Sequence, residues 1–592
     1  MRSLVLLFTP SVTHPTPKIF NPSLLCISMS QTATIRCPLC NDQVDKLLYR
    51  YHFDNERAVL EKIKANNPGW TVNDGACSRC VDYYHAELVM QQRILPEIGP
   101  HFPIKSADDF IILPTGLRLN ADPRFTGKGV TICFIDSGFY PHPDLTAHKN
   151  RIKAIIDIPN NKTLSQVSPP TGGGGLEGAA WHGTMTSVVC AGDGYLSKGL
   201  YKGIASDAEL VLLKVSEASP PAGGGGLEGA ITTENMVKAF RWVLQHHREY
   251  DIRIVNISLG DDEALSYKQS PVDQLAEQLI EEGIVVVAAV GNDENGQVKA
   301  PANSPNVIAV GGMDDDNQLA VPAGKLYHST FGKTADDIMK PELVAPAIWI
   351  AAPILPETRE QREAEALHCI LQTGDIYTAF EKLSGDIQIN PAILQSGDAG
   401  LIKDSVLQRI QTGKYISPHY MHVDGTSFAA PIVSSIIAQL LETDPTLTPV
   451  MIRHLLFSTA KRIHNFPAER QGFGTVQPKK AILKIVNKPV MIKPEISPLI
   501  NSQQKTIGFY VQHSCASQIS LAGSFNHWEQ DSLLLEPGTN GVWKIEIPML
   551  PAGRYLYKFF VDDRSWMEDI NNPYREPDGF SGFNSILIVD NQ

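Results

Sequence analysis

Four polar residues of this chain are of the types that together cleave a peptide bond, and each lies at the end of an apolar segment. Asp136 and Asn292 follow strand-like apolar runs, whereas His182 and Ser427 each open an apolar helical run. A serine can attack a carbonyl carbon when a neighbouring histidine takes its proton and a carboxylate orients that histidine. A side-chain amide and a helix amino terminus both favour the negative charge that develops on the carbonyl oxygen. These residue types predict nucleophilic acyl transfer, provided that the fold brings them together.

The segments that carry these residues alternate between strand and helix patterns. Continuous apolar runs predict strands buried on both faces, and helical periodicity falls between them at Glu234–His247 and Asp273–Glu282. The alternation predicts an α/β domain with a parallel, doubly wound sheet, in which the site lies at the carboxyl ends of the strands. The expected strands are Val130–Ile135, Leu210–Val215, Ile252–Leu259, Ile284–Val290 and Val307–Val310.

Taken singly, these residues have ordinary structural explanations, because an aspartate at a strand end commonly caps a turn and a lone histidine is more often structural. Taken together, they occur in the order Asp, His, Asn, Ser and resemble the subtilases, the family of subtilisin-like serine peptidases. The resemblance covers roughly residues 116–485. The matching segments are the strand ending at Asp136, the His-Gly-Thr at 182–184, the strand ending at Asn292, the Gly-Thr-Ser-Phe-Ala-Ala-Pro at 425–431, and the blocks Asn256–Gly260 and Lys340–Pro346.

The resemblance implies a serine endopeptidase and a role for each matching residue. Ser427 would be the nucleophile, His182 its general base and later acid, and Asp136 the group that orients the imidazole. Asn292 and the backbone N–H of Ser427 would form the oxyanion hole. Pro431 is expected in the first turn of the helix that Ser427 opens, where no intrahelical hydrogen bond is lost.

The same resemblance assigns two short segments to substrate binding. One would pair with the substrate backbone as an added strand, and the other would wall the pocket for the residue before the cleaved bond. The residues of the first are Ser258, Leu259 and Gly260, and those of the second are Ala289, Val290 and Gly291. Asp144 matches a carboxylate that helps to bind calcium in many relatives, but the loop after His182 lacks the usual asparagine ligands, so calcium stays undecided.

Two C-x-x-C pairs lie in the amino-terminal region, residues 29–115. Four thiolates have the number and softness for a closed tetrahedral zinc site, with no position open for water. We therefore expect a structural zinc ion, while a redox dithiol or two unrelated surface pairs are the alternatives. The proposed ligands are Cys37, Cys40, Cys77 and Cys80. Residues 1–28 contain no Asp or Glu and are either an over-extended start, with Met29 as the initiator, or a weak targeting segment.

Two further features depart from a minimal subtilase. An insertion at about 356–414, with helical patterns at Glu357–Leu383 and Leu401–Thr412, enters just before the nucleophile. It is either a cap that restricts substrate size or a peripheral decoration. In addition, Pro169–Ala179 recurs with one substitution as Pro220–Ala230, so that four consecutive glycines and one glutamate occur twice. The two glutamates, Glu177 and Glu228, would attract basic substrate residues if these loops border the cleft.

The carboxy-terminal part of the chain changes to an all-β pattern. A proline-bearing linker is expected at 486–505, followed by a small sandwich at 506–592. This module resembles the glycogen-binding domain of AMP-activated protein kinase β-subunits, with Phe580 in place of the usual aliphatic residue. The resemblance implies either α-glucan binding or a docking role without sugar. The residues that match the sugar contacts are Trp528, Lys558, Trp566 and Asn584.

The charge and the apolar runs of the chain argue against two classes of protein. The formal net charge of -13 argues against non-specific nucleic-acid binding, and the apolar runs are far too short to span a membrane. The expected partner is a protein or peptide substrate. Thiolate pairs favour a cytoplasmic location, with secretion or organelle targeting as alternatives. The competing functions are a catalytically inactive binding protein of the same fold and an acyl-transferring peptide ligase.

Overall fold

The computed structural model describes residues 35–39, 43–44, 53–76, 80, 84, 112–164, 181–217, 231–261, 263–318, 324–486, 497–513, 516–538 and 541–590. Within these ranges no helix is both long and apolar enough to cross a membrane. The segment 1–28 and both copies of the glycine-rich repeat, with Glu177 and Glu228, lie outside them.

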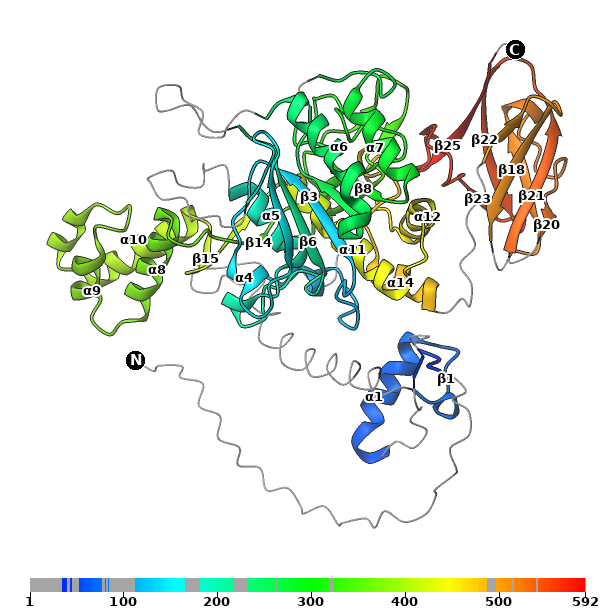
Figure 1. The fold of residues 1–592 in the computed structure, drawn as a ribbon. Helices are drawn as coiled ribbons and strands as arrows, with labels where there is room; N and C mark the ends of the chain where they lie inside the picture. Colours follow the sequence, from blue (N-terminus) through cyan, green and yellow to red (C-terminus); the bar gives the residue numbers. More distant parts are fainter. Residues whose placement is uncertain are drawn as a thin grey trace.

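A nine-stranded sheet forms the centre of the largest domain (Figure 1). Its strand order is β10-β9-β8-β7-β3-β6-β4-β5, and β13 pairs with β9. The sheet is parallel except at its short edge strands β5 and β10, which pair antiparallel with the strands that precede them. The prediction of a parallel sheet therefore holds for its centre, whereas short returning segments make its edges mixed. The bounds are β3 Thr131–Asp136, β4 Ile152–Asp157, β5 Lys162–Thr163, β6 Glu209–Lys214, β7 Ile252–Ile257, β8 Val285–Ala289, β9 Ile308–Asp314, β10 Lys325–Leu326 and β13 Leu343–Pro346.

Helices cover both faces of this sheet, as a doubly wound fold requires. One face packs against α6 (Thr233–Tyr250) and α7 (Pro271–Glu281), and the other against α5 (Trp181–Ala191) and α11 (Thr426–Thr443). The smaller elements of the domain are α3 Thr115–Arg118, α4 Pro143–Thr146, η4 Tyr195–Ser197, β11 Gly332–Lys333, β12 Met339–Lys340, α12 Pro449–Thr459, α13 Ala468–Gln471 and α14 Pro478–Val486.

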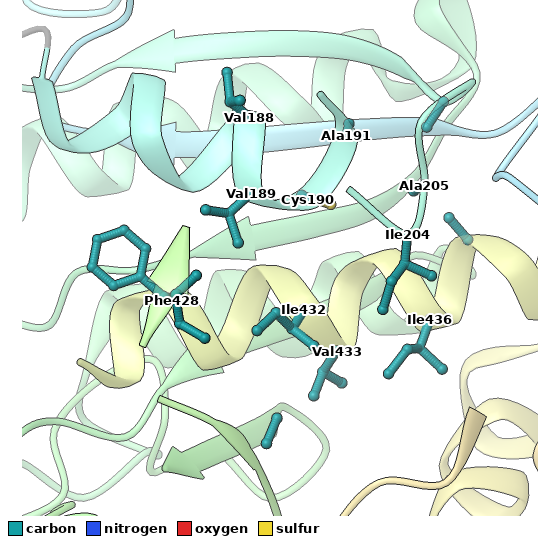
Figure 2. Close-up of a cluster of buried hydrophobic side chains, with 14 of the residues drawn as sticks. Val188, Val189, Cys190, Ala191, Ile204, Ala205, Phe428, Ile432, Val433 and Ile436 are labelled. Carbon is teal, nitrogen blue, oxygen red and sulfur yellow. The ribbon is translucent and has the colours of Figure 1, made fainter. Parts of the chain in front are cut away.

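The packing of α5 against α11 fixes the positions of their amino termini. Figure 2 shows the apolar layer between them, to which α5 contributes Val188 and Val189 and α11 contributes Phe428 and Ile432. These side chains are all buried. At the amino-terminal end of the layer, the ring centroids of His182 and Phe428 are 6.1 Å apart. The histidine that opens one helix therefore lies beside the start of the other.

A helical arm projects from the central domain between two of its strands (Figure 1). It leaves after β14 (Ile350–Pro353) and returns at β15 (Tyr415–Ser417), which pairs with β16 (Tyr420–Val423). The buried carboxylate of Glu363 accepts hydrogen bonds from the Arg409 guanidinium at 2.7 and 2.6 Å and so ties the arm's helices together. The pattern at Glu357–Leu383 forms two helices instead of one; the arm comprises α8 Arg359–Gln372, α9 Ile376–Leu383, η5 Pro391–Ser396 and α10 Ala399–Thr412.

The carboxy-terminal module is a sandwich of two antiparallel sheets. Their orders are β17-β18-β21-β20 and β19-β22-β25-β24, with β23 beside β22. Because β17 pairs with β18, the module already begins within the stretch 486–505 that the prolines predict to be a linker. The bounds are β17 Leu499–Asn501, β18 Thr506–Gln512, β19 Ile519–Gly523, η6 Ser524–Asn526, β20 Glu536–Pro537, β21 Val542–Pro548, β22 Gly553–Val561, β23 Ser565–Met567, β24 Arg575–Pro577 and β25 Phe583–Val589.

The amino-terminal region packs against the central domain through a continuous hydrophobic cluster. Its elements are β1 (Ile35–Arg36), β2 (Gln43–Val44), α1 (Phe53–Asn66) and a single turn, η1 (Val72–Asp74). Buried residues of α1 and its neighbours belong to the same cluster as Phe125 of the central domain.

Candidate active site

Asp136 and His182 meet at the carboxyl end of the central strand β3. The Asp136 Oδ1 atom lies 2.7 Å from His182 Nδ1 and also accepts the backbone N–H of Ser137 at 2.7 Å. Its other oxygen accepts the Thr186 hydroxyl at 3.1 Å. The carboxylate side chain is 1 % exposed and the imidazole 17 % exposed, so the second ring nitrogen can face a substrate while the carboxylate is shielded.

A glycine follows His182 because the helix passes very close to the loop after Asp136. A Cβ atom at position 183 would lie 2.3 Å from the carbonyl oxygen of Gly138. Any larger residue would push α5 away from this loop and lengthen the contact between His182 and Asp136.

Ser427 is the second residue of α11, as its apolar helical pattern predicts. Gly425 precedes the helix with a φ of 137°, a backbone conformation that side-chain-bearing residues rarely adopt. The Ser427 hydroxyl donates a hydrogen bond to the carbonyl oxygen of Ser258 at 3.3 Å. The nucleophile candidate therefore lies at the carboxyl end of β7, beside the strand that carries Asp136.

The position of Pro431 differs from the prediction. The helix begins at Thr426, so Pro431 is its sixth residue and lies beyond the first turn. A proline there leaves the carbonyl oxygen four residues earlier, that of Ser427, without its intrahelical donor. The Ser258 hydroxyl donates to that oxygen at 2.8 Å and so replaces the missing bond. Ser258 is thus tied to the nucleophile segment by two hydrogen bonds.

Asn292 lies next to the same helix start and its amide has a defined orientation. The Asn292 Oδ1 atom accepts the backbone N–H and the hydroxyl of Thr426, both at 2.8 Å. With the oxygen engaged by Thr426, the amide's hydrogen-bond donors lie on the other side of the group. Thr426, Ser137 and Thr186 orient the site, and none of the three is among the site residues that the sequence predicts. Only Thr186 carried a signal, since it lies four residues after His182 on the same helix face.

The two predicted substrate-binding segments follow neighbouring parallel strands. Ser258, Leu259 and Gly260 continue from β7, and Val290 and Gly291 continue from Ala289, the last residue of β8. Exposure rises along the first segment, from buried Ser258 to exposed Gly260, and Ala289 is half-buried. Both segments therefore lie at the same edge of the sheet as Ser427.

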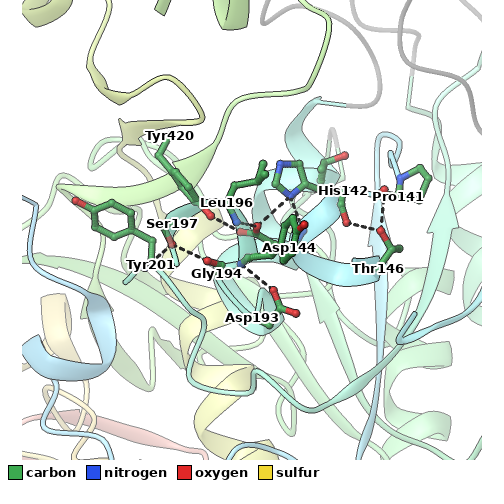
Figure 3. A network of polar contacts seen from close by, with 12 residues as sticks. Pro141, His142, Asp144, Thr146, Asp193, Gly194, Leu196, Ser197, Tyr201 and Tyr420 are labelled. Atoms are coloured by element: carbon green, nitrogen blue, oxygen red, sulfur yellow. Dashed lines mark hydrogen bonds and ion pairs between the residues drawn. The ribbon is translucent and has the colours of Figure 1, made fainter. Parts of the chain in front are cut away.

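Asp144, the residue considered for calcium, has protein partners on both oxygens (Figure 3). Oδ1 accepts the backbone N–H of Leu196 at 3.0 Å and Oδ2 accepts the Tyr420 hydroxyl at 2.5 Å. Burial raises the pKa of Asp144, whereas these two hydrogen bonds oppose that rise. Within the described ranges, no group of three or more His, Cys, Asp and Glu side chains is arranged to hold a metal ion.

Two of the four predicted zinc ligands lie in the described part of the chain and are close together. Cys37 Sγ and Cys80 Sγ are 3.8 Å apart, and both residues are buried. The guanidinium of Arg124, in the central domain, donates to Cys80 Sγ at 3.2 Å and lies over the ring of Tyr84. Cys40 and Cys77 are outside the described residues.

The predicted sugar-contacting residues gather on one side of the carboxy-terminal module. The rings of Trp528 and Trp566 meet edge to face with centroids 5.9 Å apart, and Trp566 is 42 % exposed. Lys558 is largely buried and forms an ion pair with Asp578, a partner that the sequence did not indicate. Asn584 lies on β25 opposite Glu576, and Phe580, 90 % exposed, projects from the loop that joins β24 to β25.

Comparisons with known families identify two parts of the chain. Residues 127–474 match the subtilase family and residues 500–575 match carbohydrate-binding module 48, the isoamylase N-terminal domain family. The first match covers more than half of the 592 residues, so the chain belongs to the subtilase family and is a subtilisin-like serine peptidase. Both resemblances inferred from the sequence are thereby confirmed.

Among characterised relatives, serine protease AprX of Bacillus subtilis is 26% identical over 366 residues, which is 60% of this chain and 67% of that protein. Mycosin-1 of Mycobacterium tuberculosis is 25% identical over 372 residues, covering 60% of this chain and 69% of its own length. Among solved structures, fervidolysin of Fervidobacterium pennivorans is 18% identical with a TM-score of 0.42. That match covers 74% of this chain and only 52% of fervidolysin.

Proposed function

We propose that the chain is an active serine endopeptidase that hydrolyses peptide bonds through Asp136, His182 and Ser427. The observation that carries this proposal is the hydrogen bond between Asp136 and His182, which lies beside the amino-terminal end of α11. Ser427 turns its hydroxyl from the Ser258 carbonyl toward the imidazole, and attack on the substrate carbonyl carbon transfers the serine proton to His182. Asp136 holds the imidazole and stabilises its positive charge.

The oxyanion that forms in this step accepts hydrogen bonds from the Asn292 amide and from the backbone N–H of Ser427. His182 then gives its proton to the leaving amine, and an acyl group remains on Ser427. A water molecule, deprotonated by His182, attacks the acyl carbonyl and releases the second product. The substrate lies extended along Ser258–Gly260, with the side chain before the cleaved bond against Ala289–Gly291.

Two alternatives predict different products from the same chain. An inactive peptidase fold would cleave nothing, and a peptide ligase would pass the acyl group to an amine instead of water. Incubation of the full chain with a peptide in oxygen-18-labelled water separates them by mass spectrometry. We expect internal cleavage with the label at each new carboxyl terminus; joined peptides without the label, or intact peptide, would contradict hydrolysis.

We further propose that the carboxy-terminal module binds α-glucan rather than serving only as a docking domain. Its membership of a carbohydrate-binding family supports this proposal, as does the exposure of Trp566 and Phe580. Aromatic faces suit glucose rings because they cover C–H surface without demanding charge. Trp528 and Trp566 would contact the rings, while Lys558 and Asn584 would bond the hydroxyls.

Replacing Trp566 with alanine should weaken the binding of maltoheptaose, an α-1,4-linked glucan fragment. The loss of one stacked ring removes roughly 2 kcal/mol of apolar burial, or about a 30-fold rise in Kd. Isothermal titration calorimetry of the full chain measures it. Tyr195→Ala, at a residue of the central domain that is 45 % exposed, is the matched control and should leave Kd unchanged. Equal affinity of the two variants would contradict the role of Trp566, and no binding by the unmodified chain would favour the docking role.

We also propose that Cys37, Cys40, Cys77 and Cys80 bind one structural zinc ion. The separation of 3.8 Å between Cys37 Sγ and Cys80 Sγ supports this. A tetrahedron with Zn–S bonds of about 2.3 Å has an edge of about 3.8 Å, whereas a disulfide needs about 2.05 Å. Arg124 would offset part of the negative charge of the thiolates. Such a thiolate site is in keeping with a cytoplasmic location, which we propose on this ground alone.

A further inference from the structure

The carboxy-terminal module is docked on the peptidase domain through a buried junction. Figure 1 shows β25 on the side of the module that faces the peptidase domain, and its neighbour β24 contacts α13 of that domain. Phe583, the first residue of β25, is fully buried in a small cluster with Met339 and Ala468 of the peptidase domain. The two domains are therefore joined by packing as well as by the connecting chain.

Two arginines complete this junction from opposite sides. Arg575 of the module lies 4.3 Å from the ring centroid of Phe473 and donates to the carbonyl oxygens of Met339 and Pro341 at 3.3 and 3.4 Å. Arg462 of the peptidase domain forms an ion pair with Glu568 of the module at 2.5 Å. The side chains of this ion pair are only 28% and 14% exposed.

Glu568 links the junction to the backbone beside two of the candidate sugar contacts, Trp566 and Asn584. Its Oε1 atom accepts both the Arg462 guanidinium and the backbone N–H of Phe583, the latter at 3.3 Å. Within the described residues its other oxygen has no hydrogen-bond partner. Glu568 is two residues after Trp566, and Phe583 immediately precedes Asn584.

The other end of the same loop is held from within the module. Asp578 pairs with Lys558, and its Oδ1 atom accepts the backbone N–H groups of Phe580 at 2.7 Å and Gly582 at 3.0 Å. Burial opposes the ionisation of Asp578, but Lys558 and these two N–H groups outweigh it and hold its pKa below the usual range. The loop 578–582 is thus held by Asp578 on one side and by Glu568 on the other.

We propose that Arg462 of the peptidase domain is a positioning residue for the glucan site, so that glucan binding and docking of the module are coupled. The proposal rests on the glucan-binding function of the module. Without Arg462, the half-buried Glu568 carboxylate loses its counter-charge and turns toward water, and the Phe583 N–H loses its acceptor. Asn584, which follows Phe583, and Phe580, on the loop that ends there, then lose the support that fixes their backbone. By reciprocity, bound glucan stabilises the junction by the same factor.

The test compares maltoheptaose binding by the full chain and by Arg462→Met, which keeps an apolar side chain against Phe583. We expect Kd to rise by about tenfold, in the usual range of coupling between two sites. Arg248→Met is the matched control, since Arg248 forms an exposed ion pair with Glu282 on the opposite helical layer. Glu568→Gln keeps an acceptor for the Phe583 N–H but removes the charge. Its Kd for maltoheptaose should lie between those of the unmodified chain and of Arg462→Met.

Peptidase turnover reports folding of these variants, because neither Arg462 nor Glu568 belongs to the catalytic site. The reciprocal readout is the rise in Tm caused by maltoheptaose, which should shrink in Arg462→Met. Unchanged Kd and an unchanged Tm increment in Arg462→Met, with binding lost in Trp566→Ala, would overturn the coupling while leaving the glucan function intact. No binding by the unmodified chain would contradict both.

Discussion

Replacing Ser427 with alanine should lower kcat for peptide hydrolysis by about a millionfold while the fold persists. That magnitude is the one found for subtilisin, a member of the same family, when its nucleophile or histidine is removed. The physical reason is that no acyl-enzyme can form without the Ser427 hydroxyl, so the remaining groups can only polarise a water molecule. Steady-state cleavage of an internally quenched peptide, together with circular dichroism and Tm, measures the effect.

The control and a second substitution sharpen this expectation. Ser384→Ala, at the end of α9 where the hydroxyl donates to the Glu381 carbonyl oxygen at 3.0 Å, should leave kcat unchanged. His182→Ala should cost nearly as much as Ser427→Ala, and the double variant little more, because residues that act as a unit are not additive. Substantial activity in either single variant would show that another nucleophile or base carries the reaction.

Replacing Cys80 with serine should release zinc from the amino-terminal region. Loss of one of four thiolates should lower zinc affinity by more than about 100-fold, since even outer-sphere partners of a metal ligand contribute about 10- to 100-fold. Because zinc binding and folding are coupled in such small regions, its unfolding should shift to lower temperature. Metal analysis of protein purified without chelator, and chelator competition monitored by absorbance, measure the two effects.

Cys369→Ser provides the matched control, because Cys369 is an exposed free cysteine in the helical arm. It should leave one zinc ion per chain. Peptidase activity should change little in Cys80→Ser, because the link from the zinc region to the nucleophile helix reaches only its far end. Arg124 donates to the Asp122 carboxylate, and the Asp122 carbonyl oxygen accepts the Gln439 side chain. At about 1.5 Å per residue, Gln439 lies roughly 18 Å along the helix from Ser427. Absence of zinc in the unmodified chain would contradict the site.

The catalytic candidates could be predicted because each is marked by strong local sequence. The strand before Asp136 and the helix after Ser427 are both continuous apolar runs, and the doubly wound topology brings strand ends to one edge. What could not be predicted is how the groups are held. Thr426 reaches Asn292 across 134 positions of the chain, and Ser258 reaches the Ser427 carbonyl across 169. Such pairs leave no periodic signal.

Errors in the predicted elements have equally specific causes. The prolines predict a linker that extends past the true start of the module, because β17 spans three residues, too few for alternation to register. The apolar run after Ser427 predicts a helix that Ser427 opens and so puts Pro431 in its first turn, whereas the helix begins at Thr426, directly after Gly425. The junction of Arg462 with Glu568 joins residues of two domains, and neither residue type stands out in a surface of mixed charge.

The central claim is that Ser427 is the nucleophile of an active peptidase, and covalent labelling with a fluorophosphonate tests it most directly. Such reagents form a stable phosphonyl ester with a serine that an adjacent base activates. The full chain is labelled, digested, and mapped by tandem mass spectrometry, with Ser427→Ala and Ser384→Ala as paired variants. The account predicts one adduct per chain on Ser427, retained in Ser384→Ala and lost in Ser427→Ala. An unlabelled chain that is folded, or an adduct that persists on another residue in Ser427→Ala, would contradict it.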